Sequence, residues 1–250
     1  MTLFKHSLTA AADRLGLALI PKWRLDRLPF TEHLSKLLRQ YEIDLVIDVG
    51  ANVGQYRDFL RNEVGYEGWI ASFEPDPDTW QILEERARND PRWRAYHTAL
   101  GAQAGTATLN VTGHSTLNSL LKPDFDSTDF AALKREVVRE VTVPVSTLDH
   151  DLPQLLDEFK AKNAYLKLDT QGFDLEVLRG AEHSLKNIAA LQFEGSVVPL
   201  YEGMPSYSDM LEHLMPQGFS ISNMFAICHD TALRMLEFDC VMVRADPNTA

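Results

Sequence analysis

The feature that most constrains the fold of this chain is a regular alternation of short apolar runs with helical patterns, which begins at residue 43. In chain order, the patterns predict strands at 43–49, 69–73 and 93–100 and helices at 54–65 and 78–87, the second helix capped by Asp78. Strands joined by helices pair in parallel through right-handed crossovers. The alternation therefore predicts an α/β fold in which helices on both faces cover a mostly parallel sheet.

The later part of the chain breaks this alternation and then resumes it. Residues 106–111 and 141–145 have the pattern of additional short strands. After them, the patterns predict helices at 152–160 and 174–185, strands at 164–168 and 188–193, a helix capped by Ser206, and a closing antiparallel pair at 219–227 and 236–243. No internal repeat and no linker rich in Pro, Gly or Ser divides residues 41–250, so we expect them to form one domain.

Two amphipathic helical patterns precede the alternation, the first over residues 3–19 and the second from Thr31, the expected N-cap, to Tyr41. Pro21 ends the first pattern. We therefore expect residues 1–40 to form an N-terminal helical extension that caps the domain of residues 41–250. Simple packing is one interpretation of such a cap, and a lid over a substrate is the other.

Composition excludes several classes of function. The 250 residues include 24 Lys and Arg against 36 Asp and Glu, for a formal net charge of −12, and such an acidic chain repels the phosphate backbone of nucleic acids. No run approaches the roughly 20 apolar residues of a membrane-spanning helix. Two cysteines, Cys228 and Cys240, are too few for a disulfide framework and lack metal-ligand spacing. A reducing compartment is therefore favoured, and we expect a cytoplasmic protein.

The first predicted strand runs into a glycine-rich turn, Asp48-Val49-Gly50-Ala51-Asn52-Val53-Gly54, that opens a helix. Gly50 allows a tight turn with bare backbone for a ligand, and Gly54 allows the helix to approach closely. In open α/β sheets, ligands bind in the crevice beyond the carboxyl ends of the strands. The spacing is G-x-x-x-G rather than the G-x-G-x-x-G of a dinucleotide site.

An acid before this turn suits a cation better than a pyrophosphate, which wants free N–H donors. S-adenosylmethionine carries an ammonium and a sulfonium, so Asp48 would orient its amino-acid moiety directly or through water. Glu74, at the end of the second strand, is placed to accept hydrogen bonds from both ribose hydroxyls. Taken alone, Asp48 is also typical of an acid that caps a helix, and Glu74 is also typical of a solvated strand end. Together they predict S-adenosylmethionine as cofactor, bound by Asp48, Gly50, Asn52, Gly54 and Glu74.

Three segments together resemble the FkbM family of S-adenosylmethionine-dependent methyltransferases. They are the turn at 47–55, Phe73-Glu74-Pro75, and the run 166–181 with the pattern K-x-D-x-Q-G-x-D-x-E-V-L-x-G-A. The resemblance covers about residues 41–245, with mild departures at Thr170, where an aliphatic residue is common, and Asp174, where Glu is common. It implies the class I methyltransferase fold, Rossmann-like, with a seven-stranded sheet whose last strand is antiparallel. It also implies O-methylation of a hydroxyl on a sugar, glycan, polyketide or similar metabolite.

Methyl transfer to a hydroxyl needs an aligned acceptor and a base for one proton. In the implied fold, Asp169 ends the fourth core strand nearest the transferred methyl, as base or acceptor-orienter, although it is also a candidate N-cap for the next helix. Glu194 ends the following strand, as partner base or hydroxyl acceptor. Gln171 would hold the acceptor or the Asp169 loop, and His114, in the polar loop 113–118, is a candidate acceptor-side base or a solvated side chain. The same acids suit Mg²⁺ or Ca²⁺, but no dedicated metal motif is present, so we predict no metal.

Two other functions share parts of this pattern. An NAD(P)-dependent oxidoreductase would share the strand–turn–helix opening, but the third glycine and a Tyr-x-x-x-Lys pair are missing. A non-catalytic module that binds S-adenosylmethionine would keep the residues that bind the cofactor but would not transfer its methyl group to any acceptor. The expected partner is a small-molecule or glycan acceptor, neutral or cationic rather than polyanionic because the chain is acidic. The oligomeric state is left open.

Overall fold

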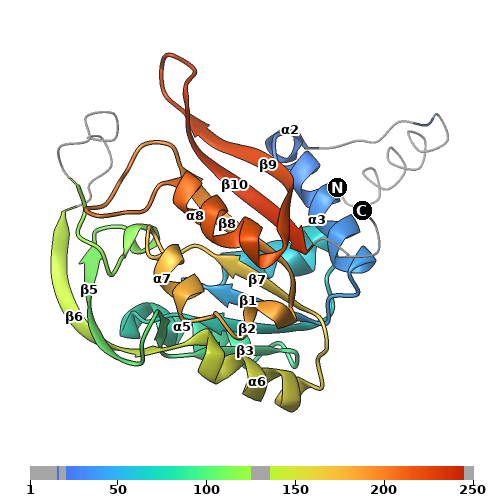
Figure 1. Cartoon of the computed structure of the whole chain (residues 1–250), viewed down its shortest axis with the longest axis horizontal. Helices are drawn as coiled ribbons and strands as arrows, with labels where there is room; N and C mark the ends of the chain where they lie inside the picture. The colour runs from blue at the N-terminus through green and yellow to red at the C-terminus, as the bar shows by residue number, and fades with distance from the viewer. Residues whose placement is uncertain (1–15, 17–20, 125–135, 245–250) are drawn as a thin grey trace, which may run out of the picture.

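The computed structural model describes residue 16 and residues 21–124 and 136–244. Its centre is a seven-stranded sheet with the order β3-β2-β1-β7-β8-β10-β9 (Figure 1). The strands are β1 (Leu45–Val49), β2 (Trp69–Phe73), β3 (Trp93–Tyr96), β7 (Ala164–Leu168), β8 (Ile188–Ser196), β9 (Phe219–His229) and β10 (Met235–Arg244). β10 is antiparallel to both of its neighbours, and β1, β2, β3, β7 and β8 pair in parallel. The predicted mostly parallel sheet with a final antiparallel strand is confirmed.

Helices cover both faces of this sheet. On one face lie α3 (Leu28–Gln40), α4 (Gln55–Phe59) with its π-helical continuation η1 (Leu60–Val64), and α5 (Pro77–Ala87), whose apolar side chains pack with Val46, Ile70 and Tyr165. On the other lie α6 (Leu148–Phe159), α7 (Asp174–Arg179) and α8 (Tyr207–Leu214), packed with Ile47 and Leu166. The central parallel strands β1 and β7 are buried on both faces, which explains why they are largely apolar runs in the sequence.

A second, three-stranded sheet has the order β4-β6-β5 and lies beside the first (Figure 1). It consists of β4 (Ala99–Leu100), β5 (Gly105–Thr112) and β6 (Val137–Ser146). The single strand predicted at 93–100 is wrong, because its first half pairs with β2 and its second half pairs with β6 in the other sheet. The second sheet carries the segment 115–120 toward the carboxyl ends of the main strands, where Ser119 bridges back to Asn110.

The helix predicted to begin after Thr31 begins earlier in the structure. α3 begins at Leu28, with Pro29 in its first turn, and Thr31 lies inside the helix with its hydroxyl donating to Arg27 O at 3.0 Å. Proline is favoured in a first turn because its missing N–H would have no partner there, so the helix begins before the predicted cap. The predicted helix at 3–19 lies outside the described residues, and α2 (Lys22–Leu25) precedes α3. Leu34 of α3 is completely buried, and the domain boundary at residue 40 stays a prediction.

Two further helix ends differ from the patterns. Asp76, not Asp78, caps α5 by accepting from Thr79, because its extended backbone aims the carboxylate at the first turn. The helix predicted at 174–185 ends at Arg179 with Gly180 as its C-cap residue, where a Cβ would lie 2.0 Å from Gly101 O. The predicted cap Ser206 is confirmed, with a reciprocal capping box.

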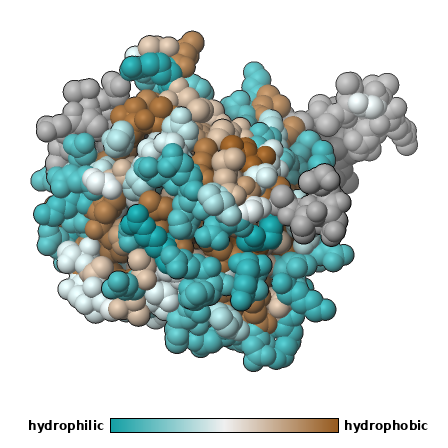
Figure 2. Space-filling view, viewed as in Figure 1, coloured by the Kyte–Doolittle hydropathy of each residue, from teal (hydrophilic) through white to brown (hydrophobic). Residues whose placement is uncertain are grey.

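The surface view shows hydrophilic side chains around separate apolar patches, one of them at the tip of the β9–β10 hairpin (Figure 2). Leu233, in the turn of that hairpin, is 84% exposed. Over residues 21–124 and 136–244, no helix combines the length and the apolar character needed to cross a bilayer.

Candidate active site

Residues in register across four adjacent strands, β2, β1, β7 and β8, form rows that run across the sheet. Three such rows lie on one face, and the third, at the carboxyl ends of the strands, forms the site. The first row is apolar and consists of Ile70, Val46, Tyr165 and Ala190. The second is polar and consists of Ser72, Asp48, Lys167 and Gln192, in register with one another. The third comes two positions further on and consists of Glu74, Gly50, Asp169 and Glu194. Because side chains alternate between the faces of a strand, positions two apart share a face, so the polar row lies directly beneath the site.

The polar row is held together by a buried ion pair. Lys167 Nζ lies 3.0 Å from Asp48 Oδ1 and 3.2 Å from Asp169 Oδ2. Ser72 Oγ donates to Asp48 Oδ2 at 3.2 Å and accepts from Trp93 Nε1 at 2.9 Å. Burial by itself lowers the pKa of Lys167, but the carboxylates of Asp169 and Asp48 outweigh it and raise that pKa above its usual value. Lys167 is therefore an ammonium ion that joins the interior of the sheet to the site.

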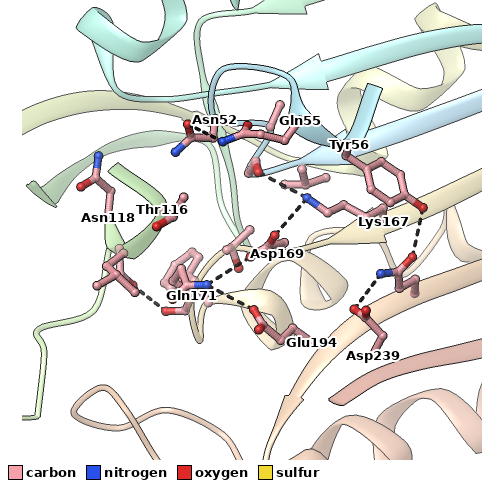
Figure 3. Close-up of a pocket in the computed structure, with 18 of the residues that line it drawn as sticks. Asn52, Gln55, Tyr56, Thr116, Asn118, Lys167, Asp169, Gln171, Glu194 and Asp239 are labelled. Atoms are coloured by element: carbon pink, nitrogen blue, oxygen red, sulfur yellow. Dashed lines mark hydrogen bonds and ion pairs between the residues drawn. The ribbon is translucent and has the colours of Figure 1, made fainter. Parts of the chain in front are cut away.

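A cavity of about 690 Å³ opens at the carboxyl ends of these strands (Figure 3). This volume lies within the roughly 300–1,000 Å³ of small-molecule sites. Of the residues predicted from the sequence, the cavity brings together Gly50, Asn52, Glu74, Asp169, Gln171 and Glu194. Three predicted residues do not line it, namely Asp48, Gly54 and His114.

Glu74 lines the cavity, where it is 6% exposed. Its Oε2 accepts from Asn52 N at 2.8 Å and its Oε1 from Asp76 N at 2.9 Å. Burial raises the pKa of Glu74 to about 7, even though the two N–H donors act in the opposite direction. Each oxygen keeps one lone pair for a ligand, because each accepts a single hydrogen bond.

The two glycines of the turn have different roles. Gly50 has φ +78°, and a Cβ there would lie 1.9 Å from Asp169 O, so only glycine lets β1 and β7 lie this close where they leave the sheet. Gly54 has φ +89°, and a Cβ there would lie 2.6 Å from the Trp93 side chain. Gly54 thus packs α4 onto Trp93 behind the cavity and is not a lining residue.

Asp48 is placed differently from the sequence prediction. It has no exposed surface and its carboxylate faces Lys167 and Ser72 instead of the cavity. The reason is its position in the second row, under α4, one step short of the strand end. Asp48 therefore does not reach the cavity, which argues against a direct contact with a cofactor, whereas its predicted orienting role through water stays a prediction. Asp48 supports Lys167 from beneath.

Gln171 brings the two predicted carboxylates together (Figure 3). Its Nε2 donates to Asp169 Oδ1 and to Glu194 Oε2, both at 3.2 Å, and its Oε1 accepts from Tyr201 OH at 2.8 Å. The two carboxylates require the amide nitrogen to face them, so the amide oxygen faces Tyr201, whose hydroxyl also lies 3.1 Å from Leu117 O. Burial first, and then the charge of Asp169, raise the pKa of Glu194 well above its usual value. The pair therefore consists of one carboxylate held by Lys167 and one that binds its proton more tightly.

The alternative role of Asp169 as a helix cap is not what the structure shows. α7 has Phe173 at its N-cap position and no side chain caps it. Instead, Asp174 accepts from Thr170 N at 2.9 Å and from the Thr170 hydroxyl, which closes the loop after β7. The side chain of Asp169 is 40% exposed and lines the cavity.

The loop expected near a ligand does line the cavity, but through residues other than His114. His114 is exposed, whereas the segment 115–120 forms the wall, with η2 (Ser115–Leu117) at its start. Ser115 Oγ donates to Asn52 Oδ1 at 3.3 Å. Asn118 Oδ1 accepts from Thr112 N at 3.0 Å, and its buried Nδ2 has no hydrogen-bond partner among the described residues. The exposed position of His114 agrees with the interpretation as a solvated side chain, and its role as an acceptor-side base stays a prediction.

Sequence reasoning missed the polar chain at the opposite end of the cavity. Tyr56 OH and Tyr165 OH donate to Gln192 Oε1 at 3.0 and 3.1 Å, and Gln192 Nε2 donates to Asp239 Oδ1 at 2.8 Å. The available signal was a polar residue inside an otherwise apolar strand, as for Lys167 in β7 and Gln192 in β8. Over the described ranges, no three His, Cys, Asp or Glu side chains are grouped to hold a metal ion.

Sequence comparison identifies the class of protein that this fold and site define. The family described as the methyltransferase FkbM domain matches residues 48–221, which is more than half of the chain. The chain therefore belongs to the FkbM methyltransferase family, and the resemblance noted in the sequence is confirmed. The matched segment includes both glycines of the turn, Glu74 and the whole 166–181 run.

Two curated methyltransferases are similar to the chain. Methyltransferase sdnD of Sordaria araneosa is 25% identical over 216 residues, covering 77% of this chain and 80% of that protein. Hexuronic acid methyltransferase AglP of Haloferax volcanii is 25% identical over 170 residues, and the match spans 66% of this chain and 62% of AglP. Among solved structures, methyltransferase FkbM from Methylobacillus flagellatus KT aligns with a TM-score of 0.48 at 16% identity, over 80% of this chain and 43% of that one.

Proposed function

We propose that the chain is an S-adenosylmethionine-dependent methyltransferase that methylates a hydroxyl on a sugar, glycan, polyketide or similar metabolite. The observation that carries the proposal is one continuous cavity with Glu74 after β2 and Asp169 after β7, two strands away in the sheet order. The family assignment supports methyl transfer as the reaction.

The residues present fit S-adenosylmethionine. Glu74 has acceptor capacity left for ribose hydroxyls, and Gly50 presents bare backbone to the cavity. Asn118 Nδ2 is a buried donor without a protein partner among the described residues, and a ligand acceptor would relieve a cost of about 1–3 kcal/mol. When bound, the cofactor supplies a methyl group activated by a sulfonium.

Asp169 and Glu194, the two carboxylates joined by Gln171, have different roles in the transfer. Asp169, held by Lys167 and Gln171, has a fixed orientation and positions the acceptor. Glu194, whose pKa is raised first by burial and then by the charge of Asp169, is the general base that accepts the hydroxyl proton as the acceptor oxygen bonds to carbon. Gln171 holds both groups in one geometry, which a displacement reaction requires.

The test is transfer of label from methyl-labelled S-adenosylmethionine to a metabolite extract. Wild-type protein should label an acceptor, whereas Asp169→Asn and Glu194→Gln should bind the cofactor normally and lose about 100-fold or more of the transfer rate. Asp157→Asn, at an 86% exposed carboxylate on α6, is the matched control and should keep full activity. Cofactor binding without any transfer would indicate a non-catalytic module, and binding of NADH instead would indicate an oxidoreductase.

A further inference from the structure

We propose that Asp239 recognises a second hydroxyl of the acceptor, and that the methylated moiety is therefore a polyhydroxylated group without negative charge. This inference rests on the proposed function and adds the chemical class of the acceptor to it. Four observations carry it: the pairing of Asp239 with Glu194, the hydrogen-bond chain that aims Asp239, the free oxygen of Asp239, and the charge of the surrounding wall.

Asp239 on β10 lies directly opposite Glu194 on β8 in the antiparallel pair, and both side chains line the cavity. Like charges at directly opposed strand positions are destabilising. The fold therefore gives up stability to hold two carboxylates side by side at this wall. Such an arrangement suits a ligand that donates hydrogen bonds to both.

A buried hydrogen-bond chain sets the direction of Asp239. Both Tyr56 and Tyr165 donate to Gln192 Oε1, so the amide nitrogen of Gln192 must face Asp239, where it donates to Oδ1 at 2.8 Å. Tyr165 has no exposed surface and Gln192 is 4% exposed, so neither can turn away to water. The chain acts as a fixed support, and Figure 3 shows Tyr56 and Asp239 at its two ends.

The second oxygen of Asp239 is left for a ligand. No described residue donates a hydrogen bond to Oδ2, and the side chain lines the cavity. A carboxylate has about four acceptor positions and is seldom left with a single neutral donor. Burial, followed by the charge of Asp169, raises the pKa of Asp239 only to about 6, so the group is mainly an acceptor at neutral pH.

The wall around Asp239 disfavours an anionic acceptor. Besides Glu74, the acids that line the cavity are Asp26, Asp169, Glu194, Glu237 and Asp239. The lining cations are Lys167, which already faces Asp48 and Asp169, and Arg27, whose guanidinium lies 4.5 Å from the Phe59 ring centroid. Their charges lower the pKa of Asp239 but do not offset its burial, and the acids in the lining outnumber them. Like-charge contacts at an interface cost several kcal/mol by the general rule, so a carboxylated moiety such as a uronate meets repulsion here.

The first experiment identifies the charge of the methylated moiety. Label is transferred from S-adenosylmethionine to an extract, the products are hydrolysed in acid to remove any carrier, and the labelled moiety is passed over an anion exchanger at pH 8. We expect the label in the unretained fraction as a methyl ether. Label retained as an acid, or lost as methanol from a methyl ester, would overturn the inference and leave the proposed function standing. No transfer at all would overturn the proposed function and this inference with it.

The second experiment separates recognition from stability, with the acceptor fraction from the first. Asp239→Asn keeps the shape of the side chain and removes one of two opposed charges, so the variant should unfold no more easily than wild type. Its KM for the acceptor should rise about 10- to 100-fold, with the Kd for S-adenosylmethionine unchanged. Asp157→Asn is the control for loss of a surface charge. An unchanged KM, or a loss of stability in place of the KM effect, would overturn the role of Asp239.

Discussion

Lys167 on β7 and Asp48 on β1 face each other in register, with Nζ 3.0 Å from Oδ1 and side chains that are 6% and 0% exposed. The same ammonium lies 3.2 Å from Asp169 Oδ2 at the edge of the cavity. A charge completely inside the sheet is thus connected through one lysine to a charge that lines the cavity. This connection makes the stability of the core and the geometry of the site depend on the same residue.

Lys167→Met should destabilise the protein by about 3–5 kcal/mol, because it leaves the Asp48 carboxylate buried without a counter-charge. The double variant Asp48→Asn with Lys167→Met should recover part of that loss, since no uncompensated charge remains. Denaturant unfolding at pH 7 measures both. Lys160→Met, at a 78% exposed lysine paired with Asp157, should change stability by less than about 1 kcal/mol. Strictly additive effects of Asp48→Asn and Lys167→Met would show that the two residues do not interact.

Gly50→Ala and Gly65→Ala form a matched pair of substitutions. The two glycines have nearly the same backbone, φ +78° and +76°, but a Cβ at Gly50 would lie 1.9 Å from Asp169 O while a Cβ at Gly65 meets nothing within 4 Å. Gly65→Ala should lower the free energy of unfolding by only about 1–2 kcal/mol, the cost of placing an L-residue in the left-handed backbone conformation. Gly50→Ala should cost more than about 4 kcal/mol or prevent folding. Equal unfolding midpoints for the two variants would contradict the close approach of the turn to β7.

Glu74 should make stability fall as pH rises toward neutrality. Burial raises the pKa of Glu74 from 4.5 to about 7, so between these values the folded protein binds more protons than the unfolded chain. The free energy of unfolding therefore decreases with pH across this window, by up to about 1.4 kcal/mol per pH unit, and the contribution is constant above it. Glu74→Gln should remove this part of the slope in unfolding curves measured from pH 4.5 to 8. A variant with the wild-type slope would show that Glu74 is not the group responsible.

Tyr201→Phe should reduce turnover without affecting cofactor affinity. Its hydroxyl donates to Gln171 Oε1 at 2.8 Å, so its loss frees the amide to rotate and to release Asp169 or Glu194. We expect kcat for methyl transfer to the acceptor to fall about 10-fold, because the loss of one hydrogen bond that holds the reacting groups raises the barrier by roughly the energy of that bond. The exposed Tyr207 supplies the control variant Tyr207→Phe. The orienting role would be refuted if kcat stayed at the wild-type value, or if the affinity for S-adenosylmethionine fell in parallel.

Much of the fold follows from local sequence patterns. The strand at 43–49, the turn through Gly50 and the closing pair at 219–227 and 236–243 are found with small shifts at their ends, because apolar runs and turn glycines are local signals. The split of 93–100 between two sheets is not local. It depends on whether β2 or β6 offers the partner backbone, and no pattern within those eight residues contains that information.

The site shows the same division between local and long-range information. Glu74, Asp169 and Glu194 were predictable because each follows an apolar run at the same edge of the sheet. The face of the sheet on which Asp48 lies was not predictable from the sequence. All five residues of β1 are buried, so the strand shows no alternation of polar and apolar residues that would distinguish its two faces. The partnership of Lys167 with Asp48, and the opposition of Asp239 to Glu194, arise from strand register, which appears only when the sheet is assembled.

The central claim is that Glu74 and the turn at Gly50 form a site for S-adenosylmethionine. Calorimetric titration of wild type and Glu74→Gln with S-adenosylmethionine at pH 8, and of wild type with NADH, tests it most directly. The account predicts micromolar affinity for wild type, an affinity about 10- to 100-fold weaker for the variant, and no binding of NADH. Absence of binding by wild type, or the same Kd for both proteins, would contradict it.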